Sequence, residues 1–119
     1  MGIIMHSGSV EINSGGDSIN AASSGNECDE SVRCSGNCAC YININEGLLK
    51  IISEEDGLDS NGDITITGGK IIIFASSEGA DQPIDQDGLL SITGDAIIVA
   101  GSNSMSGVKA QTNQIEKNI

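Results

Sequence analysis

Short acidic turns recur along the chain, and their oxygen atoms have the chemistry to bind a metal ion. The run DGLDSNGDITITGG contains one such turn, and two imperfect copies stand upstream and downstream of it. Carboxylate and carbonyl oxygens are the ligands that Ca²⁺ takes, in flexible sets of about six to eight. The matching pairs are Asp17 with Asn20, Asp56 with Asp59, and Asp81 with Asp85, the last copy carrying one extra residue.

Stacking of these turns would bring like charges together. Equivalent positions of neighbouring strands lie about 4.8 Å apart, and carboxylates that close repel one another unless a cation neutralises them. We therefore expect bound Ca²⁺. The alternative is that these are ordinary solvated turn aspartates, which bond their own backbone. The expected calcium ligands are Asp17, Asn20, Glu55, Asp56, Asp59, Asp63, Asp81, Asp85 and Asp87.

The elements that must position these turns are short strands, two after each turn, with alternating apolar residues. Gly47 and Gly69 begin successive second strands 22 residues apart, and Asp95 follows 26 residues later. A repeat of this length without a helical segment is typical of stacked repeats that cannot bury a face alone. We predict an all-β fold, a short parallel β-helix (solenoid), as one domain over residues 1–110. A polar tail follows over residues 111–119.

The repeats predict five stacked columns of apolar side chains as the core. Aliphatic and β-branched residues suit such strands, and the only aromatic residues are Tyr41 and Phe74. The columns are Val10, Leu49, Ile71 and Ile97; Ile12, Ile51, Ile73 and Val99; Ile42, Ile64 and Leu90; Ile44, Ile66 and Ile92; and Ile19, Leu58 and Ile84.

All four cysteines fall in one polar insertion at about residues 22–40. An even number of clustered cysteines in a loop without its own core indicates two disulfides, with three possible pairings. A four-thiolate zinc site is the competing interpretation, but the usual two-residue spacing between ligands is missing. Disulfides would place the protein outside the cytosol. The residues are Cys28, Cys34, Cys38 and Cys40.

Composition limits the partners. The 119 residues contain 17 acidic and five basic side chains, a formal charge of -12, which argues against nucleic acid or an anionic membrane surface. No apolar run of about 20 residues is present, so we expect no membrane insertion. Residues 1–10 show no pattern of a signal peptide.

The run from Asp56 to Ile71 carries a family resemblance, together with Ile84 to Gly94 and Val99 to Met105. It resembles the closing part of bacterial carbohydrate-binding β-helix proteins, which are secreted or surface-attached in anaerobic degraders of plant polysaccharides. The resemblance extends over Gly8 to Met105 apart from the cysteine loop, and the turn Asp56-Gly-Leu matches the family's Asp-Gly-(Ile or Leu) pattern. It implies a right-handed parallel β-helix similar to polysaccharide lyases. It also implies bound calcium and affinity for acidic polysaccharide such as polygalacturonate, or for cellulose.

These observations together predict a non-catalytic, extracellular module that binds acidic plant polysaccharide with the help of calcium. One tyrosine and one phenylalanine are too few for sugar stacking to be the main mode of binding. A chain of charge -12 would repel an anionic sugar unless cations intervene. Calcium bridging protein and uronate carboxylates would answer both points.

Three other functions stay open. Open ends of stacked repeats could build an extracellular filament or surface assembly by self-association. A polysaccharide lyase would need a basic side chain near the sugar, and lone His6 has no evident partner. Short polar residues could form an ice-binding ladder. The candidate bases are Lys50, Lys70, Lys109, Lys117 and Arg33, and the ladder residues are Asn43, Asn45, Thr65, Thr67, Ser91 and Thr93.

Overall fold

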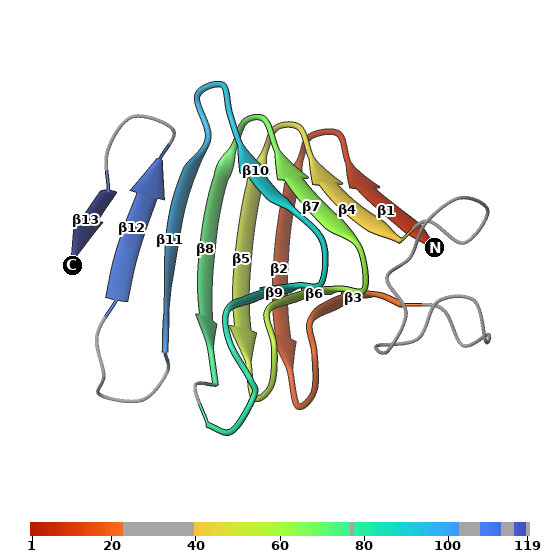
Figure 1. The fold of residues 1–119 in the computed structure, drawn as a ribbon. Coiled ribbons are helices and arrows are strands. Elements are labelled where there is room, and N and C mark those ends of the chain that lie inside the picture. Colours follow the sequence, from red (N-terminus) through yellow and green to blue (C-terminus); the bar gives the residue numbers. More distant parts are fainter. Residues whose placement is uncertain (23–39, 77, 103–107, 113–115, 119) are drawn as a thin grey trace.

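The computed structural model describes residues 1–22, 40–76, 78–102, 108–112 and 116–118, and its regular elements are β-strands in three sheets (Figure 1). The four-stranded sheet contains β1 (Gly2–Met5), β4 (Tyr41–Ile44), β7 (Asp63–Ile66) and β10 (Leu90–Ile92). The six-stranded sheet contains β2 (Ser9–Ser14), β5 (Leu48–Ser53), β8 (Lys70–Ala75), β11 (Ile97–Ser102), β12 (Val108–Thr112) and β13 (Glu116–Asn118). The three-stranded sheet contains β3 (Ile19–Ala21), β6 (Leu58–Ser60) and β9 (Ile84–Gln86).

Successive strands along the chain belong to the four-stranded, the six-stranded and the three-stranded sheet in turn. Each strand from β4 to β11 pairs in parallel with the strand three places before it in the chain, as β4 does with β1. The pattern changes after β11, because β12 and β13 both add to the six-stranded sheet in antiparallel orientation. No helix long and apolar enough to cross a membrane occurs within the described ranges.

The predicted fold class is wrong. We expected a short right-handed parallel β-helix, a solenoid with two strands per copy and a disulfide-rich loop insertion. The structure instead has three separate sheets of short strands, one of which ends in antiparallel strands. The three-stranded sheet forms within the segments that we predicted as acidic turns. Its strands have three residues each, which is too short for an alternating apolar pattern to be recognised in the sequence. The all-β class is confirmed.

The cysteine loop falls almost wholly outside the described residues. Cys28, Cys34 and Cys38 belong to the part of the chain that the structure does not describe. Cys40 is described, and it is buried immediately before β4. Both the disulfide pairing and the domain limits at residues 110 and 111 therefore stay predictions.

The core lies between the sheets and is built from stacked aliphatic side chains. Ile42, Ile64 and Leu90 occupy adjacent positions of β4, β7 and β10, as the repeats predict. Leu58 lies between Ile19 and Ile84 in the three-stranded sheet, which confirms a second predicted column. Because equivalent residues stand beside one another, each strand buries the same face as its neighbour.

The last copy departs from the predicted register by one residue. We expected Ile97 and Val99 in the core columns, but Ile98 pairs with Ile71 and Ala100 with Ile73. Ile98 is fully buried, whereas 41% of Ile97 is exposed. The segment from Ile92 to Ile97 is one residue longer than the equivalent segment from Ile66 to Lys70. Because a shift of one residue moves every side chain of a strand to the opposite face, this extra residue decides which side chains of β11 enter the core.

The core columns should contribute unequally to stability according to burial. Ile64 is fully buried in β7, while Ile4 in β1 is 46% exposed. We expect Ile64→Ala to lower the free energy of unfolding by about 2–5 kcal/mol, because it leaves a cavity. Ile4→Ala, the matched control, should lower it by less than about 1 kcal/mol. Urea denaturation measures both, and equal losses would contradict the assignment of Ile64 to the core.

Glycines at the entry to the six-stranded sheet allow close stacking of successive turns. Gly47 has a φ of 106°, and a Cβ there would lie 2.5 Å from the carbonyl oxygen of Gly8. Gly8 has a similar φ of 99°, but a Cβ there would meet no atom within 4 Å. A substitution at Gly8 therefore meets only the strain of a positive φ, whereas one at Gly47 also meets the backbone of the neighbouring turn.

Alanine substitution tests this difference. Gly8→Ala should lower the free energy of unfolding by about 1–2 kcal/mol, through the positive φ alone. Gly47→Ala should lower it further, since a backbone oxygen cannot move away without displacing the neighbouring turn. Chemical denaturation of the two variants gives the comparison. A smaller loss for Gly47→Ala would show that the turns are not in close contact.

Candidate functional site

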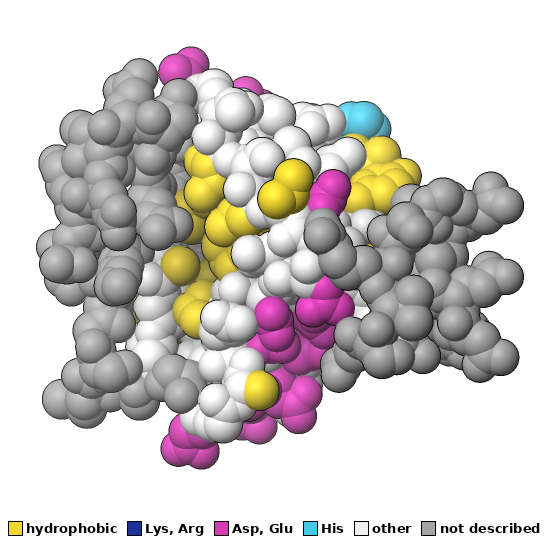
Figure 2. Space-filling model, viewed as in Figure 1, with side chains coloured by type: hydrophobic (Ala, Val, Ile, Leu, Met, Phe, Trp, Pro, Cys, Tyr) yellow, Lys and Arg dark blue, Asp and Glu magenta, His cyan; other side chains and the backbone are white. Residues whose placement is uncertain are grey.

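An acidic pocket of about 430 Å³ opens beside the three-stranded sheet, where Figure 2 shows Asp and Glu side chains gathered over β6 and β9. We call it the acidic pocket. No lysine or arginine is among the described residues that line it. Its lining residues are Asp17, Glu55, Asp56, Asp59, Asn61, Ala80, Asp81, Asp85 and Asp87.

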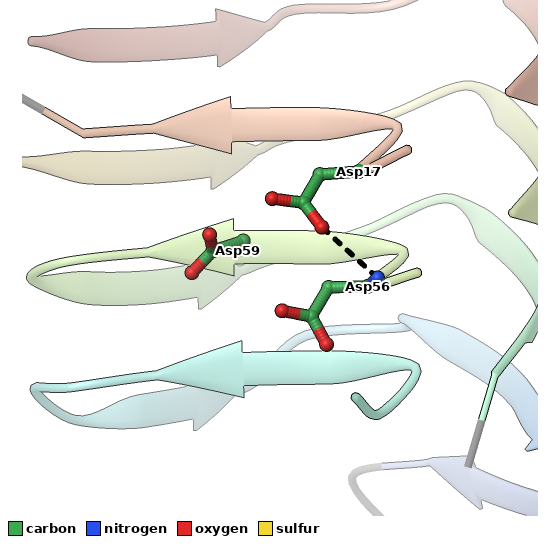
Figure 3. Close-up of side chains that lie close together, drawn as sticks. All are labelled: Asp17, Asp56 and Asp59. Atoms are coloured by element: carbon green, nitrogen blue, oxygen red, sulfur yellow. Dashed lines mark hydrogen bonds between the residues drawn. The ribbon is translucent and has the colours of Figure 1, made fainter. Parts of the chain in front are cut away.

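Two of the aspartates are held in place by backbone groups of the next turn. The Asp56 backbone N–H donates to Oδ1 of Asp17 over 3.0 Å (Figure 3). The Gln82 backbone N–H donates in the same way to Oδ1 of Asp56 over 2.7 Å. Each carboxylate thus caps the turn that follows it in the stack, which fixes one oxygen and leaves the other directed elsewhere.

A third aspartate comes from the strand that follows the turn. Asp59 lies on β6 between Asn20 of β3 and Asp85 of β9, as the repeats predict. The side-chain amide nitrogen of Asn20 donates to Oδ2 of Asp17 over 2.8 Å and to Oδ2 of Asp59 over 3.0 Å. One amide group therefore joins two carboxylates.

Asp17, Asp56 and Asp59 form a close group, with one carboxylate oxygen from each lying within 4.8 Å of the others. Figure 3 shows Asp17 and Asp56 at adjacent turns, with Asp59 on the neighbouring strand β6. Asp56 is 8% exposed, so water screens its charge only in part. The arrangement concentrates negative charge at a site where the neighbouring N–H groups offset it only partially.

Burial and mutual repulsion raise the pKa of two of these groups. Burial, followed by the charge and hydrogen bonding of Asp17 and the charges of Asp56 and Asp85, raises the pKa of Asp59 to about 7. Burial is also the largest cause that raises the pKa of Asp56, with the charges of Asp17, Asp85 and Asp81 adding to it. The Gln82 N–H opposes that rise. The site therefore favours a bound proton or a bound cation.

The structure brings most of the predicted ligands together. Seven of the nine line the acidic pocket, and Asn20 contacts two of them through its amide. Asp63 is the exception, because it begins β7 in the four-stranded sheet. There its Oδ1 accepts the Leu89 backbone N–H over 2.8 Å. Whether any of the nine binds metal stays a prediction.

The ladder of turn aspartates is shorter than expected. We predicted Asp81 as the third member after Asp17 and Asp56, but Gln82 occupies that position. Ile84 pairs with Leu58, so Gln82, two residues before Ile84, is level with Asp56, and the extra residue of this turn lies before Gln82. Asp81 still lines the pocket from beside the ladder.

Sequence reasoning missed Asn61, which lines the pocket and is 5% exposed. Its backbone N–H donates to the carbonyl of Ala21 over 3.1 Å, which holds the end of β6 against the end of β3. In the sequence it stands before Gly62 and has the pattern of an ordinary turn residue. Only the stacking of the strands shows that this turn is buried.

A family model described as "Carbohydrate-binding domain-containing protein" matches residues 2–118. The chain belongs to this family. No curated protein and no solved structure matches it. Membership in the carbohydrate-binding domain family confirms the predicted resemblance at that level. Calcium binding and secretion stay predictions.

The raised pKa of Asp59 predicts an unusual pH dependence. Between its unfolded value near 3.8 and its folded value of about 7, the folded protein retains a proton that the unfolded chain has released. The free energy of unfolding should therefore fall as pH rises through this window and then level off. Urea denaturation at several pH values, with chelator present, measures this fall.

Asp59→Asn should flatten this fall and stabilise the metal-free protein by about 1 kcal/mol at pH 7, a figure discounted for solvent screening. Asp95→Asn, at an exposed turn, serves as the control and should leave the profile unchanged. An unchanged profile for Asp59→Asn would show that repulsion within the acidic pocket is negligible.

Proposed function

We propose that this chain is a non-catalytic, extracellular domain that binds acidic polysaccharide and holds Ca²⁺ in the acidic pocket. The observation that carries the proposal is the group of Asp17, Asp56 and Asp59, with an oxygen of each within 4.8 Å of the others. The chain belongs to a carbohydrate-binding domain family, which supports a glycan as the partner.

The donor set suits a hard divalent cation. Asp17 and Asp56 each use Oδ1 to accept a backbone N–H, so their other oxygens are directed toward the remaining acids. Rotation of the Asn20 amide about its terminal bond would replace its nitrogen with Oδ1, which adds a neutral oxygen ligand. Oxygen ligands in irregular geometry favour Ca²⁺ over Mg²⁺, which demands near-octahedral coordination.

An acidic polysaccharide fits a pocket of this charge when a cation lies between the two. With a formal charge of -12, the chain repels uronate groups at long range, and Ca²⁺ offers both sides a shared ligand. The open sides of the pocket leave coordination positions for sugar carboxylates. Polymer binding at the acidic pocket would then require the cation.

Two observations support a role without catalysis. The family description names binding only. In the pocket, the carboxylates of Asp17 and Asp56 cap backbone N–H groups, which is a positioning role and leaves Oδ1 unavailable as a base. Extracellular location rests on the clustered cysteines, which suit an oxidising compartment.

A second candidate function, a subunit of an extracellular assembly, is supported by the sheet edges. The terminal strands β1, β2 and β3 each end one of the three sheets. Unpaired strand edges are templates for pairing with another chain. Sedimentation velocity over a range of protein concentrations tests this, since growth beyond the monomer would support it.

Calcium titration tests the main proposal. In isothermal calorimetry of chelator-treated protein, we expect Ca²⁺ to bind and to raise the affinity for polygalacturonate added afterwards. Asp59→Asn should weaken calcium binding about tenfold or more, because it removes a charged ligand but retains the shape and the Asp17 and Asp56 caps. The control Asp95→Asn should bind calcium as the unsubstituted protein does. Polymer affinity that is the same with calcium and with chelator would refute the proposal.

A further inference from the structure

A second concave site lies on the outer face of the six-stranded sheet, over β2, β5 and β8. We call it the outer groove; its volume is about 290 Å³. Side chains alternate along these strands, so Leu49 and Ile51 are buried in the core while their neighbours on β5 point outward. The outward side chains that line the groove are Glu11, Asn13, Lys50, Ile52, Ile72 and Phe74.

Strand register places apolar and polar groups side by side in the outer groove. Ile52 of β5 stands opposite Phe74 of β8, and Ile52 is 51% exposed. Two residues earlier on the same face of the sheet, Lys50 of β5 stands between Glu11 of β2 and Ile72 of β8. The groove thus has an apolar floor with charged groups along one side, and exposed apolar surface of this kind marks binding sites.

Positive charge is also placed on this face. Lys50 and Lys70 are the lysines whose side chains the structure describes, and both are exposed on the outer face of the six-stranded sheet. The face drawn in Figure 2, which includes the acidic pocket, shows no lysine or arginine among its coloured side chains. Within the described part of the chain, an anionic polymer would therefore meet less repulsion at the outer groove than at the acidic pocket.

We propose that the outer groove is a direct, calcium-independent binding site for an acidic polysaccharide chain. The apolar faces of sugar rings pack on Phe74 and Ile52, Lys50 pairs with a uronate carboxylate, and Asn13 and Glu11 bond sugar hydroxyls. This proposal rests on the proposed function and adds a site that shares no lining residue with the acidic pocket. Lys50 offers a partner for a carboxylate beside the apolar floor, and this combination favours an acidic glycan over a purely apolar partner.

Binding of galacturonate oligomers by calorimetry, with chelator present throughout, tests the outer groove. Phe74→Ala should weaken binding about tenfold, because it removes the aromatic platform. Lys50→Gln should weaken it about fivefold and reduce its dependence on salt. Two matched controls should change the affinity less than about twofold. These are Leu89→Ala, at a 67% exposed apolar side chain before β10, and Lys70→Gln, on the same face but outside the groove.

Two readouts keep the test interpretable. Urea denaturation of each variant should show a cooperative transition, which shows that the fold is intact. Lys50 is exposed, so Lys50→Gln reports on the groove even where Phe74→Ala fails to fold. Wild-type affinity in both groove variants would overturn the proposal. So would a Phe74→Ala variant that loses self-association in sedimentation but keeps its sugar affinity, because the groove would then bind a second copy of the chain.

The same titrations distinguish failure of the outer groove from failure of the proposed function. Polymer binding in calcium but none in chelator would overturn the outer groove and leave the calcium-dependent function standing. No polymer binding in either condition would refute both. Binding in chelator that calcium strengthens, and that Asp59→Asn returns to the chelator level, would support both sites together.

Discussion

Parallel pairing of equivalent positions is the constraint on which the structure depends. Each residue of one copy stands beside the residue at the equivalent position of the next, so Ile42 meets Ile64 and Asp59 meets Asp85. For aliphatic side chains this builds a continuous core without large aromatic residues. For carboxylates the same pairing creates repulsion. One geometric rule therefore generates both the stability of the sheets and the charge of the acidic pocket.

Among the described residues, backbone N–H groups and one side-chain amide, rather than basic side chains, offset the repulsion between these carboxylates. Asp17 and Asp56 accept N–H groups of the following turns, and Asn20 joins two carboxylates through one amide. These bonds hold the acids close together but do not neutralise them, which is why burial and neighbouring charges raise the pKa of Asp59. A preorganised group of carboxylate oxygens, with no lysine or arginine among the described residues around it, is well suited to bind a cation.

The two candidate sites divide the chemistry of glycan recognition between different sheets. The acidic pocket beside the three-stranded sheet offers oxygen ligands, whereas the outer groove offers an apolar floor with Lys50. The alternation of side chains in β5 makes the outer groove possible, since one face of the strand supplies core residues and the other supplies binding groups. A small aliphatic domain can in this way present two kinds of surface without a second core.

The sequence alone determined the all-β class, three of the five core columns, and most of the acids of the pocket, because parallel strands repeat their pattern visibly. It did not reveal the three-stranded sheet, since segments such as Leu58–Ser60 are too short to show alternation. It also placed Ile97 where Ile98 belongs, and Asp81 where Gln82 belongs. Only the tertiary structure decided strand register, because one extra residue in a turn moves the side chains of the following strand to the opposite face. It also decided burial, because only the stacking of the strands shows which turns are shielded from solvent.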